Sequence, residues 1–154
     1  MADESILVPV DFSDVTDAVL DRAARLAAAM GAKVWLIHVA SPQPNFTGYE
    51  IGPVFIREDV AEELHRQHGQ LMDCRERLQR RGVEATAMLV PGAVPEKILA
   101  EADRLEAGWI VLDSHGHGAL YHLLAGSVCE GVLKGAKCPV VVVPARQGKD
   151  DPDE

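Results

Sequence analysis

Five short, strongly apolar segments recur along the chain, and patterns typical of α-helices lie between them. The apolar segments cover residues 5–10, 33–39, 84–90, 109–112 and 139–143. Aliphatic runs of this length, bounded by turn residues, are typical of buried strands. Strands that alternate with helices pair in parallel, because each crossover needs about a dozen residues and lays a helix against the sheet. The sequence therefore predicts an α/β fold with a doubly wound, five-stranded parallel sheet.

The predicted helices carry start and stop signals. Residues 11–14 (DFSD) supply N-cap candidates for a helix that ends at Gly31, and Gly82 ends a second helix predicted over residues 58–81. Further helices are expected over residues 95–106, with Pro95 at the start, and over residues 127–134. Prolines and glycines punctuate residues 40–57, which we expect to form a long loop.

A glycine-bearing loop separates the last two predicted strands. It contains Gly116 and Gly118, and Gly126–Ser127 then open the last helix. Glycines let backbone amides approach a ligand closely, and a helix start directs unpaired N–H groups and the positive dipole end at the same place. The pattern predicts a phosphate cradle, although Gly126–Ser127 could also serve only as an N-cap turn, and Asp11 or Ser13 only as helix caps.

Composition limits the alternatives. The chain has 154 residues, 47% of them hydrophobic, which suits one domain over residues 1–146 followed by a charged, disordered tail over residues 147–154. A formal net charge of -9 without a basic cluster argues against nucleic-acid binding. No segment approaches the ~20 apolar residues of a membrane span, and the N-terminal residues lack a signal-peptide pattern, so we expect a cytoplasmic protein.

Other site chemistries find little support in the motifs. Cys74, Cys129 and Cys138 form an odd set without a C-x-x-C spacing, so we interpret them as small buried or half-buried residues and not as a disulfide framework, a zinc site or a redox site. The chain has no G-x-G-x-x-G after its first strand and no P-loop, and Ser114 lacks a nucleophile elbow. Its histidines accompany no recognised ligand set, so the metal-binding residues, if any, stay unassigned.

Several motifs together resemble the universal stress protein family, of the UspA-like type, over essentially the whole chain. The family's nucleotide-binding branch carries the pattern G-x-x-G, nine residues, G-[ST], which Gly116, Gly126 and Ser127 fit and from which Asp113 departs at the first position. The other matching segments are residues 9–13 (PVDFS), 38–39 (HV), 114–116 (SHG), 126–128 (GSV) and 138–143 (CPVVVV). The resemblance implies an adenine nucleotide alpha hydrolase-like sheet of order 3-2-1-4-5, with a nucleotide crevice between strands one and four.

The resemblance also implies roles for individual residues toward ATP or AMP. Asp11 and the backbone at Val39 would face adenine or ribose, and Pro9 and Val10 would line the base pocket. Gly116, Gly126, Ser127 and Val128 would hold phosphates, with Cys129 close enough to touch one. The complete predicted site is Pro9, Val10, Asp11, Val39, Leu112, Asp113, Gly116, Gly126, Ser127, Val128 and Cys129.

Asp113 sets the main alternative. A carboxylate where the family has glycine would repel phosphates at ~5 Å by ~3 kcal/mol, unless it turns outward or shares a Mg²⁺ with Asp11. The competing hypothesis is a nucleotide-free regulatory module in which Asp113 disables the cradle and residues 40–57 contact a partner. No residue stands out as a catalytic base, so slow ATP hydrolysis is only a third hypothesis and no catalytic residue is assigned.

The last predicted strand carries four valines between two prolines. In the implied strand order it lies at an edge of the sheet, where an uncovered apolar strand invites pairing. The resemblance implies that this strand pairs antiparallel with its copy in a second subunit. We therefore expect a homodimer through Val140, Val141, Val142 and Val143, the alternative being a monomer whose edge is shielded by charged residues or the tail.

Overall fold

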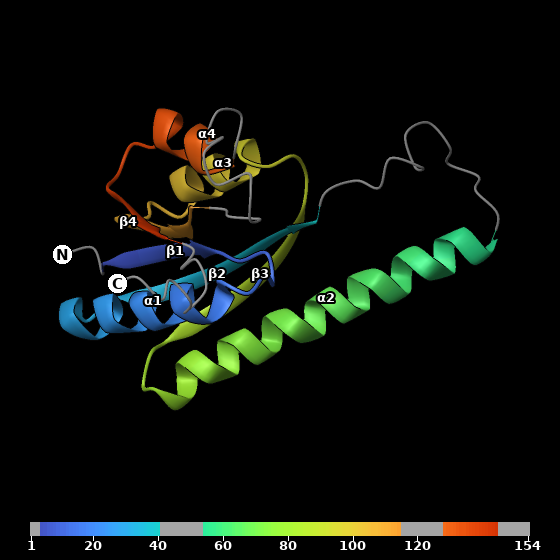
Figure 1. Ribbon diagram of the computed structural model, residues 1–154, viewed down its shortest axis with the longest axis horizontal. Coiled ribbons are helices and arrows are strands. Elements are labelled where there is room, and N and C mark those ends of the chain that lie inside the picture. Colours follow the sequence, from blue (N-terminus) through green and yellow to red (C-terminus); the bar gives the residue numbers. More distant parts are fainter. Residues whose placement is uncertain (1–3, 41–53, 115–127, 145–154) are drawn as a thin grey trace, which may run out of the picture.

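The strands form one parallel sheet in the order β3-β2-β1-β4-β5, as predicted. The computed structural model describes residues 4–40, 54–114 and 128–144 (Figure 1). Within them the strands are β1 (Ser5–Pro9), β2 (Lys33–Ala40), β3 (Ala85–Pro91), β4 (Trp109–Asp113) and β5 (Val140–Val143). The central strand β1 pairs with β2 on one side and β4 on the other, with Ile6 opposite both Val34 and Trp109. Chain order therefore reverses at β1, and β1 and β4 are neighbours.

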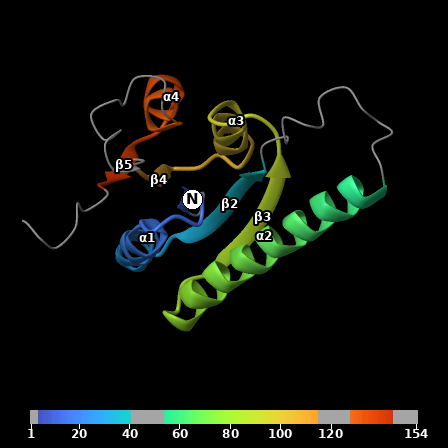
Figure 2. The same cartoon turned by 45° about the vertical axis from the view of Figure 1, so that its right-hand side comes forward.

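Four helices cover the sheet within the described residues. Their bounds are α1 (Thr16–Met30), α2 (Val54–Arg80), α3 (Glu96–Arg104) and α4 (Val128–Gly135). In Figures 1 and 2, α1 and α2 lie against one face and α3 and α4 against the other. The side chains of β1 alternate between the two faces, with Ile6 and Val8 in the core under α1 and α2 and Leu7 in the core under α3 and α4. Both cores meet at this strand.

The helix ends agree with the sequence signals at some positions and correct them at others. Gly31 adopts φ 63° and its N–H bonds the carbonyl of Ala27, so it ends α1 as predicted. The N-cap prediction was wrong in detail, because Val15 precedes α1 and no side chain caps the helix. The turn before it is instead closed by Ser13, whose Oγ accepts from the Val15 N–H at 3.4 Å.

Helix α2 begins earlier than predicted. Residues 40–57 were expected to form a loop, but the helix starts at Val54, directly after Pro53 in the sequence. A proline just before the first helical turn costs little, so it does not delimit the helix as strongly as we assumed. Leu71 and Leu78 of α2 are buried, whereas Leu64 is 39% exposed. The N-terminal part of α2 extends past the strands (Figures 1 and 2).

Strand β5 lies at the edge of the sheet. It pairs with β4 in parallel register, with Val141 opposite Val111. Val143 is buried, while Val140, Val141 and Val142 are half-buried. This confirms the predicted edge position, and pairing with a second subunit stays a prediction.

Candidate functional site

The carboxyl ends of β1 and β4 meet at the same side of the sheet. This edge is the side where the strands end, and it differs from the outer strand β5. Parallel strands all end on the same side, and the crevice beyond the point where strand order reverses is where open α/β sheets bind ligands. Here β1 ends at Pro9 and β4 at Asp113, and helix α4 begins nearby with Val128. Topology alone therefore brings these three separate segments together.

A cavity of about 280 Å³ occupies this edge. Its walls come from the ends of β1, β2 and β4, from the start of α3 and the residues just before it, and from the first residue of α4. The lining residues are Pro9, Val10, Asp11, Ile37, His38, Val39, Val94, Ile98, Leu112, Asp113 and Val128. Most are aliphatic, as in ligand pockets generally, and the polar groups stand at the strand ends.

Seven residues of the predicted site line this one cavity. They are Pro9, Val10, Asp11, Val39, Leu112, Asp113 and Val128. Gly116, Gly126 and Ser127 lie outside the described residues. The side chain of Cys129 is 2% exposed inside α4, and it is not among the residues that line the cavity. A ligand contact for each of these residues stays a prediction.

Sequence reasoning missed four lining residues: Ile37, His38, Val94 and Ile98. Ile37 lies in the second predicted strand, but its place at the cavity follows from the parallel register that sets it opposite Pro9, which the structure supplies. Ile98 lies on the buried face of α3 and is 2% exposed, but nothing in its spacing distinguishes a pocket wall from ordinary core. His38 was noted only as part of a motif and was given no role.

The turn between β1 and α1 is held by its own polar groups. The Ser13 N–H donates to Asp11 Oδ1 at 3.0 Å, and the Thr16 N–H donates to the Ser13 carbonyl at 3.0 Å. An Asx turn of this kind is a common use of aspartate. Asp11 therefore does have the local role that was weighed against a ligand role, and as an exposed residue at the cavity it remains accessible to a ligand.

Negative charge dominates the described wall of the cavity. Asp11 and Asp113 are its carboxylates, and the described lining contains no lysine or arginine. Burial raises the pKa of the Cys129 thiol above its ordinary value, and the nearby charge of Asp113 raises it further. The charge of Asp113 therefore acts at the start of α4, where an anionic ligand would otherwise be favoured.

Metal-ligating groups are sparse. In the described ranges, 4–40, 54–114 and 128–144, no three histidine, cysteine or acidic side chains cluster closely enough to hold a metal ion. A purely protein-bound metal finds no support there.

None of the helices described could cross a membrane, given their length and polarity.

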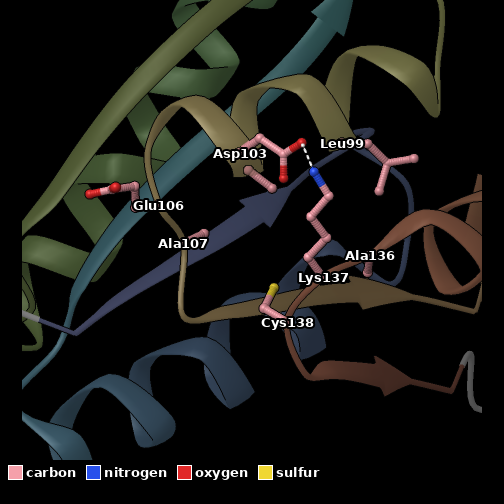
Figure 3. Close-up of a pocket in the computed structure, with 8 residues that line it drawn as sticks. Leu99, Asp103, Glu106, Ala107, Ala136, Lys137 and Cys138 are labelled. Atoms are coloured by element: carbon pink, nitrogen blue, oxygen red, sulfur yellow. Dashed lines mark hydrogen bonds and ion pairs between the residues drawn. The ribbon is translucent and has the colours of Figure 1, made fainter.

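A second cavity, of about 410 Å³, opens at the opposite edge of the sheet. It lies between the ends of α3 and α4, and Figure 3 shows Lys137 reaching across to Asp103, with an Nζ–Oδ2 distance of 3.1 Å. Cys138 lies beside them, and burial raises the pKa of its thiol. Asp103 and Lys137 are thus already paired with each other, and Glu106 is a second carboxylate in the lining.

A model of the universal stress protein family matches residues 4–144. Universal stress protein MJ0531 of Methanocaldococcus jannaschii is 31% identical over 142 residues, covering 91% of this chain and 81% of the relative.

Solved structures agree with the topology. The structure of MJ0577, from the same archaeon, is 25% identical with a TM-score of 0.80, covering 96% of this chain and all of that one. The universal stress protein from Archaeoglobus fulgidus in complex with dAMP is 25% identical with a TM-score of 0.67, covering 92% of this chain and 98% of that one.

Proposed function

The chain belongs to the universal stress protein family, and we propose that it binds an adenine nucleotide in the cavity between the ends of β1 and β4. The observation that carries the proposal is that seven of the residues predicted from the sequence line one cavity at the strand-order reversal. The dAMP complex of the Archaeoglobus fulgidus relative supports the ligand class.

The walls suit a flat base. Ile37, Ile98 and Leu112 present aliphatic side chains to the cavity, which favours burial of an apolar ring face. In the proposal, backbone groups at Val39 contact the base edge and the Asp11 carboxylate accepts hydrogen bonds from ribose hydroxyls. Gly116, Gly126, Ser127 and the start of α4 at Val128 hold phosphate oxygens, with Cys129 close by.

Charge decides which nucleotide binds best. Two carboxylates line the cavity, so each added phosphate negative charge meets repulsion of ~1 to ~3 kcal/mol from Asp113 at an effective dielectric of ~20. We propose that AMP binds more tightly than ATP without Mg²⁺. Mg²⁺ is commonly bound by one or two carboxylates, such as Asp11 and Asp113, together with phosphate oxygens. Magnesium would therefore reduce the difference in affinity between AMP and ATP.

Calorimetry tests the proposal. AMP and ATP are titrated into the purified protein with and without Mg²⁺, and AMP is expected to release heat with a measurable affinity. No heat from either nucleotide at millimolar concentration, in any of the four conditions, would end the proposal. Mass spectrometry of gently purified protein adds a check, because a co-purified adenine nucleotide is expected.

A nucleotide-free regulatory module is the second candidate. It is favoured by one observation, the position of Asp113 in the cavity wall where a phosphate would approach. In that case Asp113→Gly creates a nucleotide affinity that the natural chain lacks. A natural chain that already binds AMP excludes this candidate.

We further propose a cytoplasmic homodimer formed through the edge strand β5. Val140, Val141 and Val142 are half-buried and lie on the outermost strand, which leaves apolar side chains and one row of backbone groups for a second copy. Light scattering at micromolar concentration is expected to give twice the mass of one chain. A mass of one chain, 16.6 kDa, contradicts the dimer.

A further inference from the structure

The β1–α1 turn contains a costly backbone conformation. Phe12 adopts φ 59°, in the left-handed region that bulky side chains avoid. Such residues persist where surrounding contacts over-determine the backbone, and they are concentrated at functional sites. Asp11 directly precedes Phe12 and lines the cavity, so whatever holds Phe12 also fixes where Asp11 stands.

His38, from the end of β2, contacts the residues on both sides of Asp11. Its Nδ1 lies 2.7 Å from the carbonyl oxygen of Val10. Its ring centroid lies 4.5 Å from that of Phe12, with the planes tilted by 33°. The adjacent backbone adds a third tie, since the Val10 N–H donates to the Ile37 carbonyl at 2.9 Å. His38 therefore contacts the residue before Asp11 and the residue after it, Val10 and Phe12.

The chemistry of the acceptor assigns the proton. A carbonyl oxygen can only accept a hydrogen bond, so Nδ1 must carry hydrogen for the 2.7 Å contact to be a bond. In a neutral ring Nε2 is then an acceptor. The arrangement thus specifies one tautomer of His38, and the specified tautomer can be measured.

We propose that His38 is a positioning residue that holds the Asp11 carboxylate at the nucleotide cavity through Val10 and Phe12. The ligand in this inference is the adenine nucleotide of the proposed function. The role of His38 in holding the β1–α1 turn does not depend on that ligand. A histidine satisfied merely as half-buried core would stabilise the fold without altering Asp11. The proposal instead requires that His38 and Asp11 act on ligand affinity together.

Two measurements without ligand test whether His38 fixes the conformation of the β1–α1 turn. Nitrogen-15 NMR is expected to show His38 with hydrogen on Nδ1. The amide of Ser13, which donates to Asp11, is expected to exchange with solvent faster in His38→Gln than in His38→Asn. Asparagine places its amide nitrogen at the same distance along the side chain as Nδ1, whereas glutamine places it one bond further. Hydrogen on Nε2 alone, or equal exchange in both variants, overturns the proposal.

Affinity for AMP tests the connection to the site. His38→Gln is expected to weaken AMP binding roughly threefold to tenfold, about the value of one hydrogen bond, and His38→Asn is expected to remain within about twofold of the natural chain. In an Asp11→Asn background, the loss from His38→Gln should disappear, because the two residues act through one path. His68→Asn, on the exposed surface of α2, is the matched control.

The outcomes separate the two proposals. If the natural chain binds no adenine nucleotide, the proposed function fails, and the NMR and exchange data alone decide the role of His38 in the turn. If the natural chain binds AMP and the loss from His38→Gln is the same in both backgrounds, His38 does not act through Asp11 and the inference is overturned.

Discussion

The carboxyl and amino ends of the strands carry cavities that differ in size and in the charges of their lining residues. The cavity at the amino ends of β4 and β5 is the larger, about 410 Å³ against about 280 Å³. Yet Lys137 and Asp103 at the larger cavity neutralise each other across it. Each cavity is lined by two carboxylates, Asp103 and Glu106 at the larger and Asp11 and Asp113 at the smaller, but the described lining of the smaller cavity contains no lysine or arginine. Size alone would favour the larger cavity, whereas the proposed function rests on the chemistry of the residues at the smaller one.

The same two helices build both cavities, which makes the comparison well controlled. Helix α3 contributes Ile98 to the smaller cavity and Leu99 and Asp103 to the larger. Val128 begins α4 at the smaller cavity, and Ala136 follows its end at the larger. The difference arises from direction, because α4 directs its N–H groups at one edge and its carbonyl groups at the other.

Filling one cavity or the other with a large side chain should produce the largest difference in AMP affinity between two variants. Val128→Trp places a large ring in the smaller cavity and is expected to reduce AMP affinity by at least about 100-fold, since overpacking and lost volume both oppose the ligand. Ala136→Trp fills the larger cavity and should leave AMP affinity within about twofold. Calorimetry measures both, and circular dichroism checks that each variant is folded. Equal losses in the two variants would mean that the edges are not functionally distinct.

Charge removal should give the next largest effect. Asp113→Asn removes one negative charge from the smaller cavity at nearly constant volume, so ATP affinity without Mg²⁺ is expected to rise about tenfold to hundredfold. Asp103→Asn removes the same charge at the larger cavity and should not change ATP affinity. The gain should shrink at high salt because screening weakens the repulsion. An unchanged ATP affinity in Asp113→Asn would show that this carboxylate does not face the phosphates.

Most of the fold could be predicted because its signals are local and repeated. Five aliphatic runs and the glycines after helices, such as Gly31, specify an alternating α/β chain. The strand order could not follow from periodicity, since nothing local distinguishes β1 as the central strand, and it came from the family resemblance. The start of α2 was misplaced because Pro53 was interpreted as loop punctuation when it directly precedes the helix.

The residues of the candidate site also divide into those that could be predicted from the sequence and those that could not. Asp11 and Asp113 could be predicted from their position after apolar runs, because strand ends meet at one edge. Val94 and Ile98 could not, because a pocket wall made of aliphatic side chains has the same sequence pattern as core. His38 needed three-dimensional information, since its partners Val10 and Phe12 are 26 or more residues away in the chain.

Disrupting the ion pair at the larger cavity should cost little. The Lys137 and Asp103 side chains are 79% and 53% exposed, and exposed pairs of this kind contribute at most ~1 kcal/mol. Lys137→Ala is therefore expected to lower the free energy of unfolding by less than ~1 kcal/mol without changing AMP affinity. Urea denaturation and calorimetry measure the two quantities. A clear loss of AMP affinity would place ligand chemistry at this edge after all.

The thiols at the two edges offer the finest comparison. The pKa of Cys129 is raised by burial and then by Asp113, and that of Cys138 by burial and then by Asp103. A raised pKa in the folded state stabilises the protein below the ordinary thiol value of 9.0, and this contribution is lost as pH rises above it.

The unfolding free energy should therefore decline as the pH passes 9.0, and less steeply in Cys129→Ala and Cys138→Ala. At pH 8, iodoacetamide should modify the half-buried Cys138 faster than the buried Cys129, because the thiolate must form and be reached. Asp103→Asn should raise the rate at Cys138 slightly, and Asp113→Asn should raise the rate at Cys129 by still less, since burial already limits access there. Mass spectrometry of the modified chains measures each rate. A faster reaction at Cys129 than at Cys138 would show that the start of α4 opens to solvent far more than the burial of Cys129 indicates.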